Sequence, residues 1–71
     1  MPFISVRITR DGITKEQKSR VIAEITKTME TVLNKDPHLT QIVIEEVDTD
    51  NWGYAGTTTT EYRKNLMESK K

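Results

Sequence analysis

Apolar and polar residues alternate along two stretches of the chain, residues 3–9 and residues 40–47. In the first stretch Ile4, Val6 and Ile8 share one face, and the residues between them form the other. A period of two residues is that of a half-buried strand, because successive side chains of a strand point to opposite sides. The pattern therefore predicts two strands, each with one face directed at a core.

Between the two strands, apolar residues recur at steps of three and four, which is the period of an amphipathic helix. The helix should begin after Thr14, whose hydroxyl can accept an early backbone N–H while Gln17 reaches back, as in a capping box. It should end before Pro37, because a proline disfavours helical geometry at the preceding residue, Asp36. The apolar positions are Val21, Ile22, Ile25, Met29, Val32 and Leu33.

A strand, a helix and a second strand in about 45 residues predict a β-α-β unit, whose right-handed crossover leaves the strands parallel. Residues 52–56 follow a polar turn and predict a short hairpin, in which both glycines suit positive φ. Residues 61–71 predict a C-terminal helix with Thr60 as its cap. We therefore expect one α/β domain over residues 1–71, a small β-α-β protomer with a C-terminal hairpin.

The length of the chain predicts assembly into a homo-oligomer. In a domain of 71 residues, the free energy gained from apolar burial only about balances the cost of ordering the chain. One helix covers one face of a two-stranded sheet, whereas parallel sheets normally have both faces covered. A second copy should cover the other face, which carries Phe3, Val43 and Val47 beside Arg7 and Gln41.

Composition excludes several functions. Eleven basic and eleven acidic residues give no net charge, so there is no general attraction to nucleic acid. Apolar runs of two or three residues cannot span a membrane, and without a signal peptide a cytoplasmic location is expected. The chain has no cysteine and one histidine, His38, which follows a proline and is expected to be an exposed turn residue. We expect no metal and no cofactor.

The N-terminus offers the best candidate for chemistry. Removal of Met1 would expose the nitrogen of Pro2 as a secondary amine. Apolar burial and nearby cations disfavour the charged form of an amine, so this group can be neutral near pH 7 and act as a general base. Proline is equally permitted at the start of an edge strand without any catalytic role. If Met1 is retained, the nitrogen is an amide with no usable lone pair.

Three motifs support the catalytic reading when taken together. They are Pro2, the helix start Thr14-x-x-Gln17, and the segment Asn-Trp-Gly-Tyr-Ala-Gly at residues 51–56. With these spacings, residues 2–57 resemble the 4-oxalocrotonate tautomerase family of the tautomerase superfamily. The resemblance implies a cofactor-independent keto–enol tautomerase acting on a 2-oxo acid or similar enolisable carbonyl compound, with Pro2 as the general base. It also implies a hexamer built as a trimer of dimers.

The resemblance assigns further roles to matching positions. Trp52 matches an aromatic position that belongs to a neighbouring subunit and forms one wall of the substrate pocket. Ordinary interface packing is an equal alternative for this residue. The best-known relatives bind a dicarboxylate with two arginines, and this chain has neither at the matching positions. One arginine position falls on Gln41 and the other near Gly12 or Ile13. Gln41 can hydrogen-bond a carbonyl, but it cannot make the bidentate grip of a guanidinium on a carboxylate.

Other arginines are candidates for binding substrate, each with an alternative. Arg10 either reaches into the same pocket or is a solvated loop charge. Arg7 either stabilises an enolate or a substrate carboxylate, or pairs with Glu45 across the sheet. Arg63, near the C-terminus, is a weaker candidate for capping a neighbour's site.

Two alternatives to tautomerase activity stay open. Relatives with the same proline activate water or eliminate halide from unsaturated acids, and such hydratase or dehalogenase chemistry needs a further carboxylate. Glu46 is the candidate for that carboxylate. The other alternative is a non-catalytic oligomeric β-α-β scaffold, whose pocket lost its arginines and binds something else.

Overall fold

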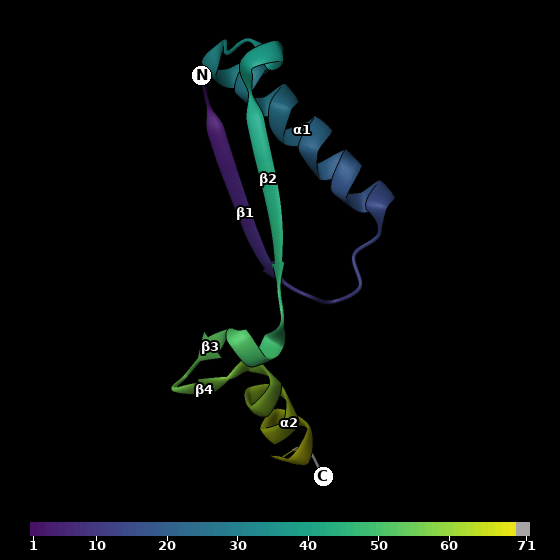
Figure 1. Cartoon of the computed structure of the whole chain (residues 1–71), viewed down its shortest axis with the longest axis vertical. Coiled ribbons are helices and arrows are strands. Elements are labelled where there is room, and N and C mark those ends of the chain that lie inside the picture. Colours follow the sequence, from purple (N-terminus) through teal and green to yellow (C-terminus); the bar gives the residue numbers. More distant parts are fainter. Residues whose placement is uncertain (70–71) are drawn as a thin grey trace.

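The computed structural model describes residues 1–69 and consists of a two-stranded parallel sheet, a long helix and a small C-terminal unit (Figure 1). Strand β1 (Phe3–Thr9) pairs in parallel with strand β2 (Gln41–Val47), and the two strands are aligned from end to end. Both predicted strands are confirmed, with β2 beginning one residue later than predicted. The parallel β-α-β fold is therefore confirmed.

Helix α1 (Lys15–Leu33) begins with the predicted capping box. The hydroxyl of Thr14 accepts from the backbone N–H of Gln17 at 3.1 Å, and the Gln17 side chain accepts from the Thr14 N–H at 2.9 Å. The helix ends where Asn34 adopts a left-handed conformation with φ of 55°, which asparagine tolerates better than most residues. The short helix η1 (Pro37–Leu39) then leads into β2.

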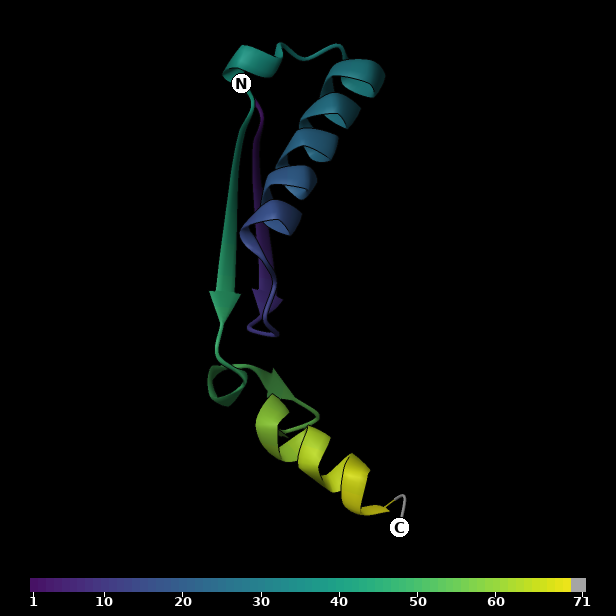
Figure 2. The same ribbon diagram turned by 90° about the vertical axis from the view of Figure 1, so that its right-hand side faces the viewer.

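Helix α1 covers one face of the sheet, and no other described element covers the opposite face (Figure 2). Ile4, Val6 and Ile8 are half-buried on the covered face, whereas Phe3 on the other face is 63% exposed. The predicted alternation of the strand is therefore confirmed. It leaves one side of the sheet open to solvent in the single chain.

The chain beyond β2 forms a separate unit. It comprises the short helix η2 (Thr49–Asn51), the antiparallel strands β3 (Gly53–Tyr54) and β4 (Thr57–Thr58), and helix α2 (Thr59–Ser69). The predicted hairpin and C-terminal helix are thus both present, at the opposite end of the molecule from the N-terminus (Figure 1).

Two details of this unit differ from the prediction. Positive φ occurs at Ala55 (54°) and Gly56 (81°), not at Gly53. These two are the central residues of the hairpin turn, and a two-residue turn of type I′ requires positive φ at both. Helix α2 begins before the predicted cap, and the hydroxyl of Thr58 accepts from the backbone N–H of Glu61 at 3.1 Å. The predicted helix extended over residues 70 and 71, which lie outside the described residues.

One chain does not close a core around itself. Its radius of gyration is 16.4 Å, whereas a compact chain of this length is expected near about 11 Å. Its accessible surface is 5786 Å², against about 4,500 Å² expected for a folded monomer of this mass. Among the side chains that the structure describes, Thr59 is buried at 7% exposure and no apolar side chain is buried. The apolar stripe of α1 and the open face of the sheet both remain accessible.

Candidate active site

Pro2 lies at the point where the two strands begin. The backbone N–H of Gln41 donates to the Pro2 carbonyl at 3.0 Å, and the parallel register places Gln41 opposite Phe3. Pro2 is half-buried, while Phe3 and Gln41 are exposed beside it. The structure therefore brings together two of the predicted site residues, Pro2 and Gln41.

Trp52 lies at the other end of the molecule. The seven residues of β1 separate the two ends by about 20 Å, at about 3.3 Å per residue, and the molecule measures 50 Å along its longest axis. Trp52 is half-buried, and its carbonyl accepts from the N–H and the hydroxyl of Thr59 at 2.7 and 2.9 Å. Pro2 and Trp52 of one chain therefore cannot line the same pocket.

A groove of about 590 Å³ lies beside Trp52, between the end of β1 and helix α2. Three aromatic side chains line it, Trp52, Tyr54 and Tyr62. The two tyrosine rings meet edge to face, with centroids 4.5 Å apart and an interplanar angle of 61°, an arrangement that aromatic pairs prefer. Trp52 is a predicted site residue and the two tyrosines are not, because Tyr54 of β3 and Tyr62 of α2 meet only through the fold.

Arg7 also lines this groove. Its Nε lies 3.5 Å from Oε1 of Glu45, directly across the sheet, and both side chains are exposed. The structure shows the pairing with Glu45, which is one of the two roles predicted for Arg7, and Arg7 is also among the residues that line the groove.

Arg10 points elsewhere in the described structure. Its Nε donates to Oδ1 of Asp48 at 2.7 Å, and its Nη2 donates to the Glu46 carbonyl at 3.4 Å. It is not among the residues that line the groove. Arg10 thus holds the loop after β1 to the end of β2.

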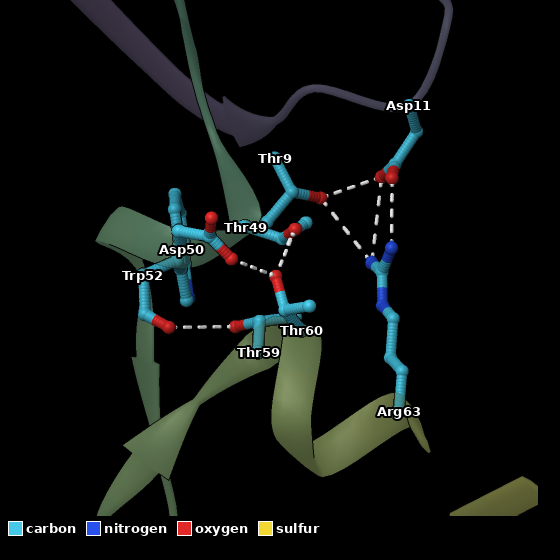
Figure 3. Close-up of polar contacts among 8 residues, drawn as sticks. All are labelled: Thr9, Asp11, Thr49, Asp50, Trp52, Thr59, Thr60 and Arg63. Carbon is cyan, nitrogen blue, oxygen red and sulfur yellow. Dashed lines mark hydrogen bonds and ion pairs between the residues drawn. The ribbon is translucent and has the colours of Figure 1, made fainter.

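Asp11 and Arg63 are two charged residues of the groove that face each other (Figure 3). Nη1 of Arg63 donates to Oδ1 of Asp11 at 2.8 Å, and Thr9 donates its hydroxyl to Oδ2 of Asp11 at 2.5 Å. The Arg63 hydrogen bond, followed by that of Thr9, holds the pKa of Asp11 below its ordinary value. The same contact raises the pKa of Arg63. No local pattern signals this pair, because 52 residues separate its members.

Threonine hydroxyls fix the start of α2 near this groove (Figure 3). The hydroxyl of Thr60 donates to Oδ1 of Asp50 at 2.6 Å, and it lies 2.5 Å from the hydroxyl of Thr49. Together with the contacts of Thr59 to the Trp52 carbonyl, these bonds tie α2 to η2. The four-threonine segment therefore positions the wall of the groove.

The two remaining ionisable candidates, His38 and Glu46, each contact an ionisable partner. His38 is exposed, as predicted, and its backbone N–H and ring contact the carboxylate of Asp36, which lowers the pKa of Asp36. Glu46 forms an ion pair with Lys18 on the covered side of the sheet, whereas Glu45 lies on the open side. The two glutamates therefore do not form a carboxylate pair, and Glu46 already has a cationic partner.

The described residues contain no cluster of three or more histidine, cysteine, aspartate or glutamate side chains suited to a metal ion. Over the same part of the chain, no helix has the length and apolar character needed to cross a membrane.

A parallel β-α-β unit, with Pro2 directly before its first strand and a short hairpin after its second, defines a small α/β protein. Residues 2–62 match the model of the family described as Tautomerase enzyme. The chain belongs to the tautomerase family, and the resemblance noted in the sequence is confirmed. Membership supports an isomerase activity of the tautomerase type.

Relatives match over most of their length. "Probable tautomerase K2" of Dickeya dadantii is 48% identical over 64 residues, which are 90% of this chain and 96% of the relative. "Probable tautomerase" of Helicobacter pylori is 38% identical over 58 residues, 79% of this chain and 85% of the relative.

Solved structures show the same fold. The crystal structure of DmpI from Helicobacter pylori has a TM-score of 0.83 at 34% identity, covering 89% of this chain and 97% of that one. A structure of the 4-oxalocrotonate tautomerase isozymes from Methylibium petroleiphilum has a TM-score of 0.82 at 28% identity, covering 90% and 98%. The arrangement of β1, α1, β2 and the hairpin is therefore that of known tautomerases.

Proposed function

We propose that this protein is a keto–enol tautomerase for a 2-oxo acid or a similar enolisable carbonyl compound. Pro2, freed by removal of Met1, is the general base. The observation that carries the proposal is the position of Pro2, half-buried at the start of β1 beside Gln41 and the exposed ring of Phe3, in a chain of the tautomerase family.

The reaction needs only a base and fixed donors. The amine of Pro2 takes the proton of the enol hydroxyl as the carbonyl bond forms. The resulting ammonium then donates a proton to the neighbouring carbon of the former C=C bond. No atom is lost and nothing is oxidised, so the proposed reaction needs no cofactor. A neutral amine is required, and apolar cover over Pro2 and Phe3 would favour the neutral form by desolvation.

The site requires more than one copy of the chain. Pro2 and Trp52 lie at opposite ends of one protomer, so the pocket forms where Pro2 of one copy meets Trp52 of another. The open face of the sheet, with Phe3 and Val43 exposed, supplies an apolar surface for this contact. We propose a homo-oligomer, with the hexamer that the family resemblance implies as its form.

The other site residues orient the substrate. Gln41 is joined to Pro2 by a backbone hydrogen bond, and in this proposal its side-chain amide donates to a substrate oxygen. Arg7 supplies positive charge at the groove, where a donor or cation stabilises a developing enolate. Arg10 can contribute in the same way by exchanging Asp48 for substrate, and Trp52 excludes water.

Intact mass and a pair of proline variants test this proposal. Mass spectrometry of the protein purified from cells should show a chain without Met1. With phenylenolpyruvate and 2-hydroxymuconate as substrates, Pro2→Ala should lower kcat/KM by about 100-fold or more, which is the usual size of general acid–base catalysis. Pro37→Ala, the matched change in the turn before β2, should leave kcat/KM unchanged.

A pH profile completes the test. The activity of the unaltered protein should titrate with an apparent pKa near neutrality that is absent from Pro2→Ala. A retained Met1, or equal rates in the protein and Pro2→Ala, would overturn the role of Pro2. A retained Met1 would instead favour the non-catalytic scaffold.

A further inference from the structure

All four arginines of the sequence lie in the described part of the chain, and each is already paired with a carboxylate. The pairs are Arg7 with Glu45, Arg10 with Asp48, Arg20 with Glu24, and Arg63 with Asp11. Two of these guanidiniums, those of Arg7 and Arg63, line the groove beside Trp52. Binding a substrate carboxylate there means displacing or sharing Glu45 or Asp11.

At the other end of the proposed pocket, the first residue of β2 is the uncharged Gln41. The backbone N–H of Gln41 donates to the Pro2 carbonyl, Gln41 pairs with Phe3 in the sheet, and its side-chain amide is neutral. A neutral amide forms single hydrogen bonds, whereas a guanidinium binds a carboxylate through two parallel charged ones. A monocarboxylate places its one carboxylate at this end. A dicarboxylate would also place a second one in the groove, where Glu45 and Asp11 already occupy the arginines.

The groove offers aromatic surface instead. Trp52, Tyr54 and Tyr62 line it together with the aliphatic side chains of Ile13 and Leu66. The edge-to-face contact of the two tyrosines holds their rings in place. A flat aromatic ring buries a large apolar area, and contacts with other rings favour it beyond that area.

We propose that the site selects an aryl-substituted 2-oxo acid, a monocarboxylate, over a dicarboxylate. This inference rests on the proposed function and names the substrate class of the same site. The carboxylate and the adjacent oxygen of the substrate lie near Pro2 and Gln41 of one copy, and the aryl ring lies in the groove of Trp52 and Tyr62 from a neighbouring copy.

The selectivity is measured as the ratio of kcat/KM for phenylenolpyruvate to that for 2-hydroxymuconate, with the assembled full-length protein. We expect a ratio of about ten or more in favour of the aryl substrate. Tyr62→Leu should lower kcat/KM for phenylenolpyruvate by up to about tenfold, the size of an aromatic contact. Tyr62→Phe, which keeps the ring, should retain the ratio.

A charge variant tests the same selectivity at the groove end of the pocket, where the two substrates differ. Glu45→Gln should raise kcat/KM for 2-hydroxymuconate by about tenfold relative to phenylenolpyruvate, because it removes the carboxylate paired with Arg7 and frees that guanidinium for the second carboxylate of the substrate. Glu24→Gln removes the exposed partner of Arg20 on α1 and should leave the ratio unchanged.

The outcomes separate this inference from the proposed function. Turnover of 2-hydroxymuconate equal to or faster than that of phenylenolpyruvate overturns the selectivity and leaves the tautomerase proposal intact. If neither substrate turns over, the proposed function fails, and calorimetric binding of phenylpyruvate and muconate still decides the inference. Tighter binding of phenylpyruvate, weakened by Tyr62→Leu, supports it, and tighter binding of muconate overturns it.

Discussion

Arg63 of α2 donates to Asp11 in the loop after β1, with 2.8 Å between Nη1 and Oδ1, and a second nitrogen lies 3.4 Å from the hydroxyl of Thr9 (Figure 3). These contacts connect the C-terminal helix to the end of the sheet. They also bring together two sides of the groove in which Trp52 lies. The contact therefore holds α2, which carries Tyr62, beside Trp52 in the groove.

Replacing Asp11 with asparagine should loosen helix α2. The change removes the charged partner of Arg63, so backbone amides of α2 should exchange with deuterium faster, as measured by mass spectrometry. The effect on the melting temperature should be small, because both side chains are exposed and solvent screens such pairs. Glu24→Gln, which removes the exposed pair of Arg20 with Glu24, is the control. Unchanged exchange in α2 would show that the Arg63 contact does not anchor the helix.

The attachment of α2 should weaken in acid. Because the folded-state pKa of Asp11 lies below its ordinary value of 3.8, its stabilising contribution is complete above that value and is lost as the pH falls through the folded pKa. Fluorescence of Trp52, the one tryptophan of the sequence, should report this change on acidification below pH 3.8.

Two variants identify the group responsible for the acid transition. Asp11→Asn should remove the Trp52 transition. Asp36→Asn should retain it, because the pKa of Asp36 is also lowered but its partner is His38, in the turn before β2. Identical transitions in the two variants would assign the change to another group.

The capping box should stabilise α1 measurably. Thr14→Ala removes the acceptor of the Gln17 N–H, and loss of such a cap should lower the free energy of unfolding by roughly 0.5–2 kcal/mol. Chemical denaturation of the assembled protein measures it. Thr28→Ala lies within the same helix, where alanine is the better helix former, and should not destabilise. An equal loss in both variants would contradict a specific role for the cap.

The open face of the sheet should be an interface between copies. Phe3→Asp places a charge on this face where an apolar ring is 63% exposed, and burying an unpaired charge is costly. Sedimentation velocity should then show a smaller species than the unaltered protein. Thr31→Asp adds the same charge on the exposed surface of α1 and should leave the sedimentation coefficient unchanged. A Phe3→Asp protein of full size would place the interface elsewhere.

The sequence by itself determined the local elements of this protein. The alternation around Ile4 and Val6, the capping box of Thr14 and Gln17, and the apolar steps of α1 each arise from neighbouring residues, whose spacing decides which face or backbone group they reach. The same local information placed Pro2 at the start of a strand. It misplaced the start of α2, because four consecutive threonines offer several equivalent caps.

The tertiary structure decided which distant residues meet. The pairing of Asp11 with Arg63, the joining of Tyr54 to Tyr62, and the engagement of Arg10 by Asp48 depend on how separate elements fold back on one another. Contacts of this kind join residues that are far apart in the sequence, so no local spacing of residue types predicts them. The separation of Pro2 from Trp52 likewise became visible only in three dimensions, since a strand about 20 Å long keeps the two ends of one chain apart.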